Sequence, residues 1–222
     1  MRFFIFLSSA LLPWSLRRLL LCRFLHYELD PTSSISRFSL VLPQKLRMGP
    51  HAQIGSCTLC KGLELLDMAE SSFIGKFNHI TGFPLGGNSR HFADNKDRIP
   101  QLILGQHAAI TSQHIIDCTD AVEIGRFATI GGFRSQILTH AVDFVNNKQS
   151  CSPVTIGDYS FVGTSVTVLP GSALPKRSVL GAKSLLSKKF EIEGHLYAGV
   201  PAALVKQCDQ GAYFHRTVGF VW

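Results

Sequence analysis

Aliphatic residues recur at every sixth position through the C-terminal half of this 222-residue chain. A period of six matches neither the 3.6-residue turn of an α-helix nor the two-residue alternation of an isolated strand. It is typical of short strands wound into a solenoid, in which each inward side chain stacks on its equivalent about 4.8 Å along the axis. The unbroken run comprises Ile156, Val162, Val168, Leu174, Leu180 and Leu186.

The same spacing returns upstream, where small residues accompany it. The chain can turn a tight corner where glycine follows the aliphatic residue, as at Gly75, Gly105, Gly125 and Gly131. These patterns predict an all-β solenoid of the parallel β-helix type, and an ordinary β-sandwich with coincidental spacing is the alternative. The upstream aliphatic residues are Ile35, Val41, Met68, Ile74, Ile80, Leu104, Ile110, Ile116, Ile124 and Ile130.

The extent of the period divides the chain into three parts. We expect an N-terminal amphipathic or capping segment over residues 1–31, the β-helix over 32–190, and a C-terminal extension over 191–222. Residues 81–100 and 141–153 lack the apolar period, so they are expected to project as loops. The chain is long enough, and at 45% hydrophobic residues apolar enough, for a single core.

Net charge indicates the class of partner, and cysteine content indicates the compartment. The net charge of +7 suits phosphate-rich ligands or anionic lipid, but no run of Lys and Arg interleaved with aromatic residues marks a nucleic-acid-binding face. The six cysteines are too scattered for a disulfide framework, which indicates a reducing, cytoplasmic compartment. Cys57 and Cys60 form a single C-x-x-C, which lacks the second pair of ligands that a structural zinc site needs.

The two ends of the chain carry apolar segments. Residues 1–14 are shorter than the roughly 20 residues that span a bilayer, and Arg17, Arg18 and Arg23 follow in place of a signal-peptide cleavage site. We expect an amphipathic helix that caps the open solenoid, contacts a membrane surface through residues 1–25, or does both. Its predicted apolar side comprises Leu12, Leu16, Leu19, Leu20 and Phe24. At the other end, four aromatic residues are expected to pack against the solenoid or a neighbouring subunit: Tyr213, Phe214, Phe220 and Trp222.

Three segments resemble the hexapeptide-repeat acyltransferases. They are TIGDYSFVGTSVTVLPGSALPKRSVLGAKSLLSKKF (155–190), YAGVPAALVK (197–206) and ILTHAVDF (137–144). The resemblance implies a left-handed parallel β-helix, a hand that the general rule for crossover connections would not predict. It also implies a homotrimer with active sites between subunits, and acetyl-CoA as cosubstrate without a metal. The implied reaction is O-acetylation of a sugar or glycan precursor, as in polysaccharide biosynthesis.

His140 is the candidate catalytic residue. Acyl transfer from a thioester to a hydroxyl needs a base that removes the hydroxyl proton, and the pKa of imidazole lies near working pH. His140 stands where a coil ends and a loop begins, and by resemblance ILTHAVDF holds the general base of the family. Asp143 is the nearest carboxylate in sequence that could orient the imidazole, although a backbone carbonyl would serve as well. On the preceding coil, Gln113 and His114 break the aliphatic pattern and could contact the acceptor.

The residues expected to bind acetyl-CoA follow from the resemblance. Gly163 and Thr164 match the corner that meets the thioester, and Ala182 and Lys183 occupy the equivalent corner one coil later. Phe161 stands where the family tends to place a bulky aromatic residue beside the acyl group. Nearer the end of the helix, the resemblance assigns phosphate and adenine contacts to Ser187, Lys188, Pro201 and Lys206.

Two other functions stay open at this point. The solenoid could be a non-catalytic assembly protein, in which His140 would be replaceable without consequence. A zinc-dependent hydratase of the carbonic-anhydrase kind would need three histidines that converge between subunits. His107 and His114 are seven residues apart, and the closely spaced histidine pair of such enzymes is absent. An acetyltransferase is therefore the favoured interpretation.

Overall fold

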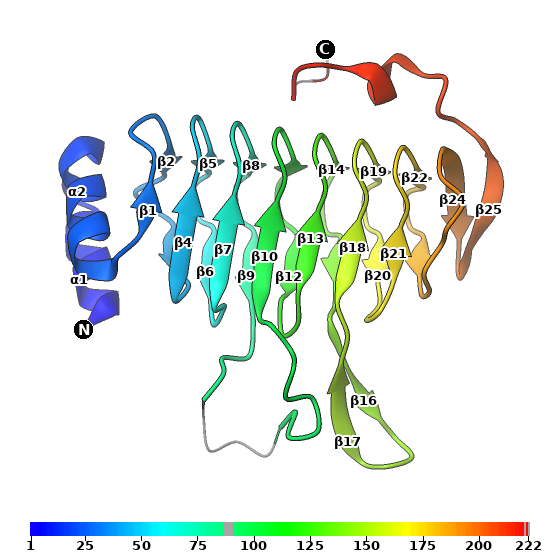
Figure 1. The fold of residues 1–222 in the computed structure, drawn as a ribbon, viewed down its shortest axis with the longest axis horizontal. Helices are drawn as coiled ribbons and strands as arrows, with labels where there is room; N and C mark the ends of the chain where they lie inside the picture. Colours follow the sequence, from blue (N-terminus) through cyan, green and yellow to red (C-terminus); the bar gives the residue numbers. More distant parts are fainter. Residues whose placement is uncertain (87–90, 220, 222) are drawn as a thin grey trace.

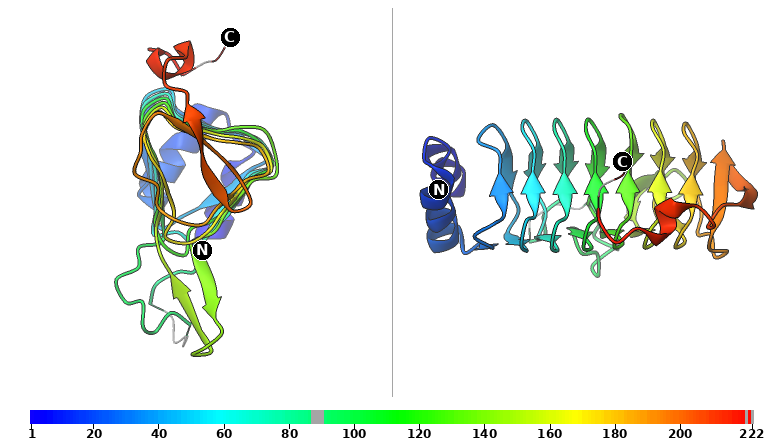
Figure 2. Two further views of the ribbon diagram at one scale, coloured as in Figure 1. Left: turned by 90° about the vertical axis from the view of Figure 1, so that its right-hand side faces the viewer. Right: turned by 90° about the horizontal axis from the view of Figure 1, so that it is seen from above.

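The chain folds into a three-sided β-helix with a helical pair at one end (Figure 1). A computed structural model describes residues 1–86, 91–219 and 221. In Figure 1 the chain rises on the near face, passes over the top and descends behind while it advances from left to right, which is a left-handed winding. The view along the axis shows the triangular cross-section (Figure 2).

Three parallel sheets form the faces of this prism. Sheet A contains β1 (Glu28–Leu29), β4 (Lys45–Met48), β7 (Leu65–Met68), β10 (Gln101–Leu104), β13 (Val122–Ile124), β18 (Val154–Ile156) and β21 (Ala173–Leu174). Sheet B contains β2 (Ser34–Ile35), β5 (Gln53–Ile54), β8 (Phe73–Ile74), β11 (Ala109–Ile110), β14 (Thr129–Ile130), β19 (Phe161–Val162), β22 (Val179–Leu180) and β24 (His195–Gly199), which β25 (Ala202–Gln207) joins antiparallel. Sheet C contains β3 (Leu40–Leu42), β6 (Leu59–Lys61), β9 (His79–Thr81), β12 (Ile115–Asp117), β15 (Gln136–Ile137), β20 (Thr167–Val168) and β23 (Leu185–Leu186). We name the corners AB, BC and CA after the sheets they join.

The predicted aliphatic ladder is the core. The six residues of the unbroken run are buried to 1% exposure or less, and the upstream members are buried as well. Coil length explains why the upstream pattern is looser. Thr155 pairs with Ala173 after a strict eighteen residues, whereas Lys45 pairs with Leu65 after twenty. The added residues lie in the corners, so the inward register is kept.

Both long excursions leave the stack at the CA corner. Residues 82–100 connect β9 to β10, and a hairpin of β16 (His140–Asp143) and β17 (Lys148–Cys151) stands between β15 and β18. These are the segments for which the period predicts loops. They project together below the solenoid in Figures 1 and 2.

Helices α1 (Arg2–Ser9) and α2 (Trp14–Leu25) lie across the N-terminal end of the solenoid (Figure 1). Three arginines of this pair donate to backbone carbonyls of the first coil, where no preceding coil is stacked. Arg18 donates to the carbonyl of Leu29, Arg17 to that of Ile35, and Arg2 to that of Pro43. The helical pair therefore seals the sheet edges that would otherwise be open for pairing.

The apolar side predicted for this segment is wrong in part. Helix α2 buries Leu21, Leu25 and the guanidinium-bearing Arg17 against the solenoid, whereas Leu16, Leu19 and Phe24 are exposed. Arg17 and Arg18 are bound to backbone carbonyls of the first coil. Among the described residues, no helix has the length and hydropathy needed to cross a membrane.

The C-terminal segment folds back along the AB corner. The 3₁₀ turn η1 (Ala212–His215) buries Phe214, and the Tyr213 hydroxyl donates to the carbonyl of Ser160 at 3.1 Å. Arg216 lies over the Tyr213 ring and donates to the carbonyl of Phe127. Tyr213 and Phe214 thus pack against the solenoid, while Phe220 and Trp222 lie outside the described residues.

Candidate active site

A histidine and an aspartate from adjacent coils meet at the CA corner. His140 begins β16 and Asp117 ends β12, one coil earlier, and Nδ1 of His140 lies 2.7 Å from Oδ2 of Asp117. Sheet register explains the meeting, because Ile116 pairs with Ile137 and so brings Asp117 to the level of the residues just before His140. Two residues far apart in sequence therefore form a hydrogen-bonded pair on a rigid frame.

The Asp117 carboxylate is held in place by five donor groups. Oδ1 accepts from the backbone N–H and hydroxyl of Thr119, and Oδ2 accepts from the backbone N–H and hydroxyl of Thr139 and from His140. Burial by itself would raise the pKa of Asp117. The hydrogen bonds from Thr119, His140 and Thr139 outweigh that effect and hold the pKa below its usual value. The carboxylate is ionised at neutral pH and accepts a hydrogen bond from His140.

The imidazole of His140 has one anchored nitrogen and one open nitrogen. With Asp117 as acceptor, the proton of the neutral ring is assigned to Nδ1, and the lone pair is on Nε2. Nε2 makes no hydrogen bond within the described part of the chain, and the side chain is 42% exposed. The pair can therefore accept a proton at Nε2 from a group bound beside the corner.

The loop of residues 82–100 packs against this pair. The Phe92 ring is buried and meets the His140 ring edge to face, with the ring centroids 5.9 Å apart. Arg98 is buried as well, and its guanidinium lies against the rings of Phe83 and Phe92. It also donates to the carbonyl of Thr119, the residue that binds Asp117. Arg98 thus ties the loop to the base of the His140 site.

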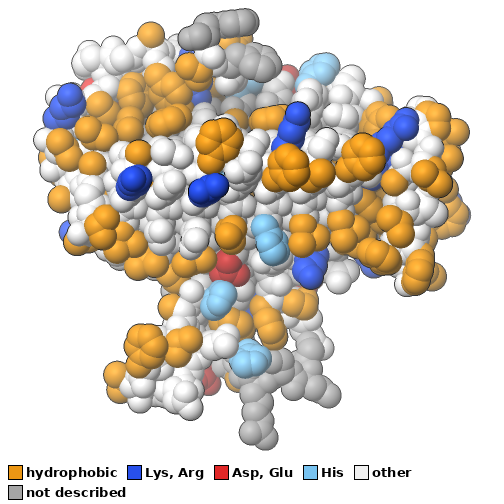
Figure 3. Space-filling model, turned by 180° about the vertical axis from the view of Figure 1, so that it is seen from behind, with side chains coloured by type: hydrophobic (Ala, Val, Ile, Leu, Met, Phe, Trp, Pro, Cys, Tyr) orange, Lys and Arg blue, Asp and Glu red, His pale blue; other side chains and the backbone are white. Residues whose placement is uncertain are grey.

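A cleft of about 500 Å³ opens between this loop and the hairpin. Asp94 from the loop and Lys148 from the hairpin approach to 2.6 Å and bridge its walls. Both residues are exposed, so this ion pair contributes little to stability. Seen from behind, the loop and hairpin form the projection below the solenoid in Figure 3. The other lining residues are His91, Phe92, Ala93, Val142, Asn147 and Gln149.

Asp143 does not contact His140. Its carboxylate accepts from the backbone N–H of Val145 and from the backbone and side chain of Asn146, within the turn of the hairpin. In the antiparallel register His140 pairs with Cys151 at one end of β16, while Asp143 pairs with Lys148 at the other. The expected partner is therefore replaced by Asp117, and Asp143 stabilises the hairpin turn.

Gln113 and His114 lie at the BC corner, on the opposite edge of sheet C from His140. The Gln113 side chain is exposed there. His114 is buried: its Nδ1 accepts from the backbone N–H of Ser135, and its Nε2 lies 2.9 Å from the Thr111 hydroxyl. Burial lowers the pKa of His114 to about 4, so the ring is neutral and structural. At 1% exposure, the His114 side chain is not open to an acceptor in the single chain.

The residues that the resemblance assigns to the thioester end of acetyl-CoA share the BC corner. Gly163 and Thr164 follow β19, and Ala182 and Lys183 follow β22 on the next coil. The N–H of Gly163 is used within the stack, since it donates to the carbonyl of Leu180, and a Cβ at this position would lie 2.8 Å from the Ala182 nitrogen. Ala182 and Lys183 are exposed, although the N–H of Lys183 is also used within the stack, since it donates to the carbonyl of Thr164.

The remaining predicted cofactor residues lie near the C-terminal end of the solenoid. Ser187 and Lys188 are exposed just after β23, and the Lys188 ammonium lies over the Phe190 ring at 5.2 Å. Pro201 and Lys206 belong to the turn and strand that follow β24, and both are exposed. Phe161 lies instead on sheet B beneath the C-terminal segment, where its ring meets Tyr213 at 5.7 Å. It is not beside His140.

Sequence reasoning missed Asp117 and Arg98. Asp117 has a signal that could have found it, because it follows the inward Ile116 just where its coil reaches the corner that His140 occupies on the next coil. Arg98 has none, since residues 82–100 carry no period from which a position could be assigned. Histidines 107 and 114 lie at different corners, and within the described residues no three His, Cys, Asp or Glu side chains are grouped as metal ligands.

Comparison with known proteins finds relatives by fold. No sequence-family description and no curated protein matches the chain. Among solved structures, the polysialic acid O-acetyltransferase OatWY matches with a TM-score of 0.57 at 17% identity, over 82% of this chain and 84% of OatWY. AntD, an N-acyltransferase from Bacillus cereus solved as a variant with dTDP-4-amino-4,6-dideoxyglucose and coenzyme A, gives 0.53 at 14% identity, over 82% and 83%.

A third match is shorter. The hexapeptide-repeat acetyltransferase VCA0836 from Vibrio cholerae, solved with acetyl-CoA, gives a TM-score of 0.49 at 20% identity, over 61% of this chain and 67% of VCA0836. The chain has the left-handed parallel β-helix fold of the hexapeptide-repeat acyltransferases.

Proposed function

We propose that the protein transfers an acetyl group from acetyl-CoA to a hydroxyl of a sugar or glycan precursor, with His140 as general base. The observation that carries the proposal is the 2.7 Å contact between His140 and Asp117, which leaves Nε2 without a hydrogen bond among the described residues. The Phe92 ring that contacts His140 also lines the cleft between the loop and the hairpin. The fold shared with OatWY and AntD supports acyl transfer in general. Asp117 takes the orienting role first expected of Asp143.

The arrangement suits direct transfer. Asp117 holds the proton on Nδ1, so Nε2 can take the proton of an acceptor hydroxyl as its oxygen attacks the acetyl carbonyl carbon. The new C–O bond forms as the thioester C–S bond breaks, and Nε2 returns the proton to the departing thiolate. The products are an O-acetylated acceptor and free coenzyme A, without a covalent acyl-enzyme.

We propose that two chains complete each site in a homotrimer. His140 lies at the CA edge of sheet C, whereas Thr164 and Ala182, the backbone positions expected to meet the thioester, lie at the BC edge. A neighbouring solenoid packed against this one would bring its BC corner to the His140 of the first chain. The cleft between the loop and the hairpin would then receive the acceptor.

The free cysteines support a cytoplasmic location.

A thiol-release assay tests the function. Full-length protein is incubated with acetyl-CoA and a panel of glycans, sugars and amino sugars, and acceptor-dependent release of coenzyme A is expected. His140→Ala should lower kcat by about 10²- to 10⁴-fold while acetyl-CoA still binds. Activity within a few-fold of wild type would remove His140 from the mechanism. Absence of acetyl-CoA binding by a folded wild type would favour the non-catalytic assembly protein instead.

A further inference from the structure

Helix α1 displays an apolar surface that the solenoid does not cover. Its buried side consists of Phe6 and Ser9, while Phe4 is 71% exposed and Leu11 is 87% exposed. The surface continues onto Phe38, which is 80% exposed at the first BC corner. We call this the N-terminal apolar face and define it as Phe3, Phe4, Leu7, Leu11 and Phe38.

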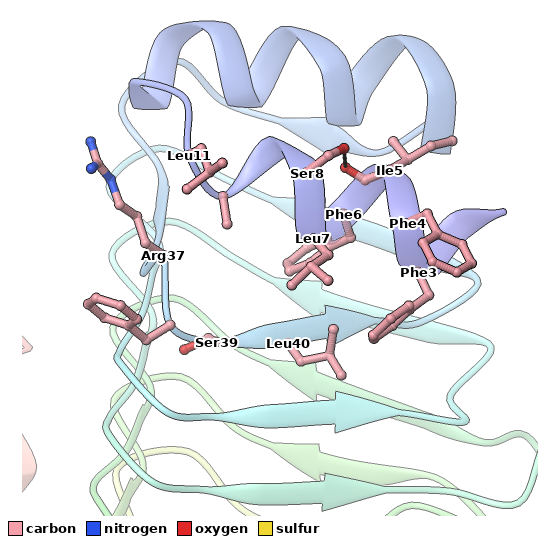
Figure 4. A pocket seen from close by; sticks show the side chains of 12 residues that line it. Phe3, Phe4, Ile5, Phe6, Leu7, Ser8, Leu11, Arg37, Ser39 and Leu40 are labelled. Carbon is pink, nitrogen blue, oxygen red and sulfur yellow. Dashed lines mark hydrogen bonds between the residues drawn. The ribbon is translucent and has the colours of Figure 1, made fainter.

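The face is hollowed rather than flat. A cleft of about 1040 Å³ lies between α1 and residues 37–40 of the first coil. Figure 4 shows Phe3 and Leu7 of α1, and Leu11 of the turn after it, above the cleft, with Leu40 of β3 below. Exposed aromatic and leucine side chains gathered around one open cleft are typical of a surface that contacts an apolar partner.

One exposed arginine stands at the rim of this face, and a second lies on the neighbouring helix. Arg37 stands at its rim (Figure 4), and Arg23 is exposed on α2. Residues 1–27 contain four arginines and no acidic residue; the first carboxylate is that of Glu28, which pairs with Arg47 at 3.3 Å. An apolar surface with a basic rim and without carboxylates is complementary to the headgroup region of an anionic bilayer.

We propose that the N-terminal apolar face docks the protein onto an anionic lipid surface. The phenylalanine and leucine side chains insert among the acyl chains at the interface, and Arg37 and Arg23 contact the phosphates. The residues differ from those that the sequence predicts, because α1 and the first corner supply the apolar side chains, and Arg17 and Arg18 are already bound to carbonyls.

The position of the face favours this partner. Helices α1 and α2 lie beyond the first coil, at one end of the long axis (Figures 1 and 2). Solenoids packed side by side would present three such ends in the same direction, and three weak contacts to one bilayer reinforce one another. The proposal deepens the proposed function, since it places a membrane-associated acceptor within reach, but the docking itself can be measured without acetyl transfer.

Vesicle flotation tests the docking. Full-length protein is mixed with vesicles of phosphatidylcholine alone or with about one third phosphatidylglycerol, and the floated fraction is measured at low and high salt. Wild type should float with the anionic vesicles and release as salt rises. The variant Phe4→Ser/Leu7→Ser/Leu11→Ser/Phe38→Ser should bind at least about tenfold more weakly. Arg37→Gln with Arg23→Gln should reduce binding to anionic vesicles and leave binding to neutral vesicles unchanged.

The hairpin tip provides the matched control. Phe144 and Val145 are 89% and 92% exposed. They belong to the turn of the β16–β17 hairpin, which projects from the solenoid away from α1 (Figure 1), so Phe144→Ser with Val145→Ser should float like wild type. Circular dichroism and light scattering establish that each variant keeps its fold and oligomeric state. Wild type that stays in solution with anionic vesicles overturns the proposal. So does an N-terminal variant that floats normally, or one that instead dissociates an oligomer, which would make a second copy the partner. Acceptor-dependent thiol release in solution reports separately on the proposed function.

Discussion

At the scale of single residues, the site depends on a carboxylate that is fixed before any ligand binds. Asp117 accepts hydrogen bonds from Thr119, Thr139 and His140, so neither its position nor its charge needs to change during proton transfer. A fixed anion of this kind sets the tautomer of a histidine and stabilises the ring when it becomes protonated.

We expect Asp117→Asn to lower kcat by about 10- to 100-fold, because the amide no longer favours the Nδ1 proton and cannot stabilise the imidazolium. Affinity for acetyl-CoA should be unchanged. Asp143→Asn is the comparison, and it should stay within about twofold of wild type, since Asp143 contacts only the hairpin turn. Equal losses in the two variants, measured by thiol release, would contradict the assignment of Asp117.

A second residue-scale prediction concerns stability. Burial holds the pKa of His114 at about 4, against 6.5 in an unfolded chain. Above pH 6.5 the ring is neutral in both states, so its contribution is unaffected; as pH falls below 6.5 only the unfolded chain gains the proton, and stability decreases until pH reaches about 4. Between pH 7 and pH 5 we expect this group to remove about 2 kcal/mol. Urea unfolding of wild type and His114→Asn at both pH values measures it, and parallel losses in the two proteins would exclude His114 as the cause.

At the scale of elements, the corners carry the geometric demands of the fold. Gly62 turns the CA corner after β6 with φ near +78°, and a Cβ there would overlap the carbonyl oxygen of Gly82 on the next coil. Gly86 has nearly the same φ, +79°, but no atom of the residues that the structure describes lies within 4 Å of the corresponding position. The two glycines therefore separate the cost of backbone conformation from the cost of close stacking.

We expect Gly62→Ala to destabilise the protein by more than about 2 kcal/mol, because strain and overlap add. Gly86→Ala should cost only about 1 kcal/mol, the strain of a left-handed backbone. Thermal and urea unfolding of both variants measure the difference. If the two substitutions had equal effects, stacking at the CA corner would not be the constraint described here.

The strands and corners also show which features a repeating sequence pattern can predict. The aliphatic residues named from the six-residue period are all buried, because the period acts through backbone geometry that each coil repeats. Three residues that are buried as well were not among those named: Ile54, Leu102 and Ile137. The same period placed His140 at a corner. Its partner was not, because Asp143 is nearest along the chain whereas Asp117 is nearest in space, one coil away. Arg98 and Phe92 belong to a loop without a period, so only the three-dimensional structure shows that they lie at the site.

At the scale of the whole molecule, the proposed trimer takes His140 from one edge of sheet C of one chain and the BC corner from the opposite edge of its neighbour. This arrangement makes the oligomer testable through activity. His140→Ala removes the base, and Ala182→Trp should block the exposed BC corner, so each homotrimer is expected to be inactive. In a mixed trimer, one groove pairs an intact His140 with an intact BC corner of the neighbouring chain.

Refolding the two variants together should therefore restore about one quarter of wild-type activity, since random mixing leaves one intact groove in each mixed trimer. Refolding either variant alone is the control, and it should restore none. Light scattering confirms that mixing occurs. Mixed trimers without activity would indicate that each chain carries a complete site, and the proposed groove between subunits would be wrong.

The placement of both insertions at the CA corner has a consequence for how such a chain can change. Strand β9 stacks on β12, and β15 on β20, as if the intervening excursions did not exist. Residues 82–100 and the hairpin can therefore be lengthened, shortened or exchanged without shifting a single rung of the interior. Under the proposed function, in which these segments receive the acceptor, the choice of acceptor is then separable from folding, because the scaffold stays constant while the segments vary.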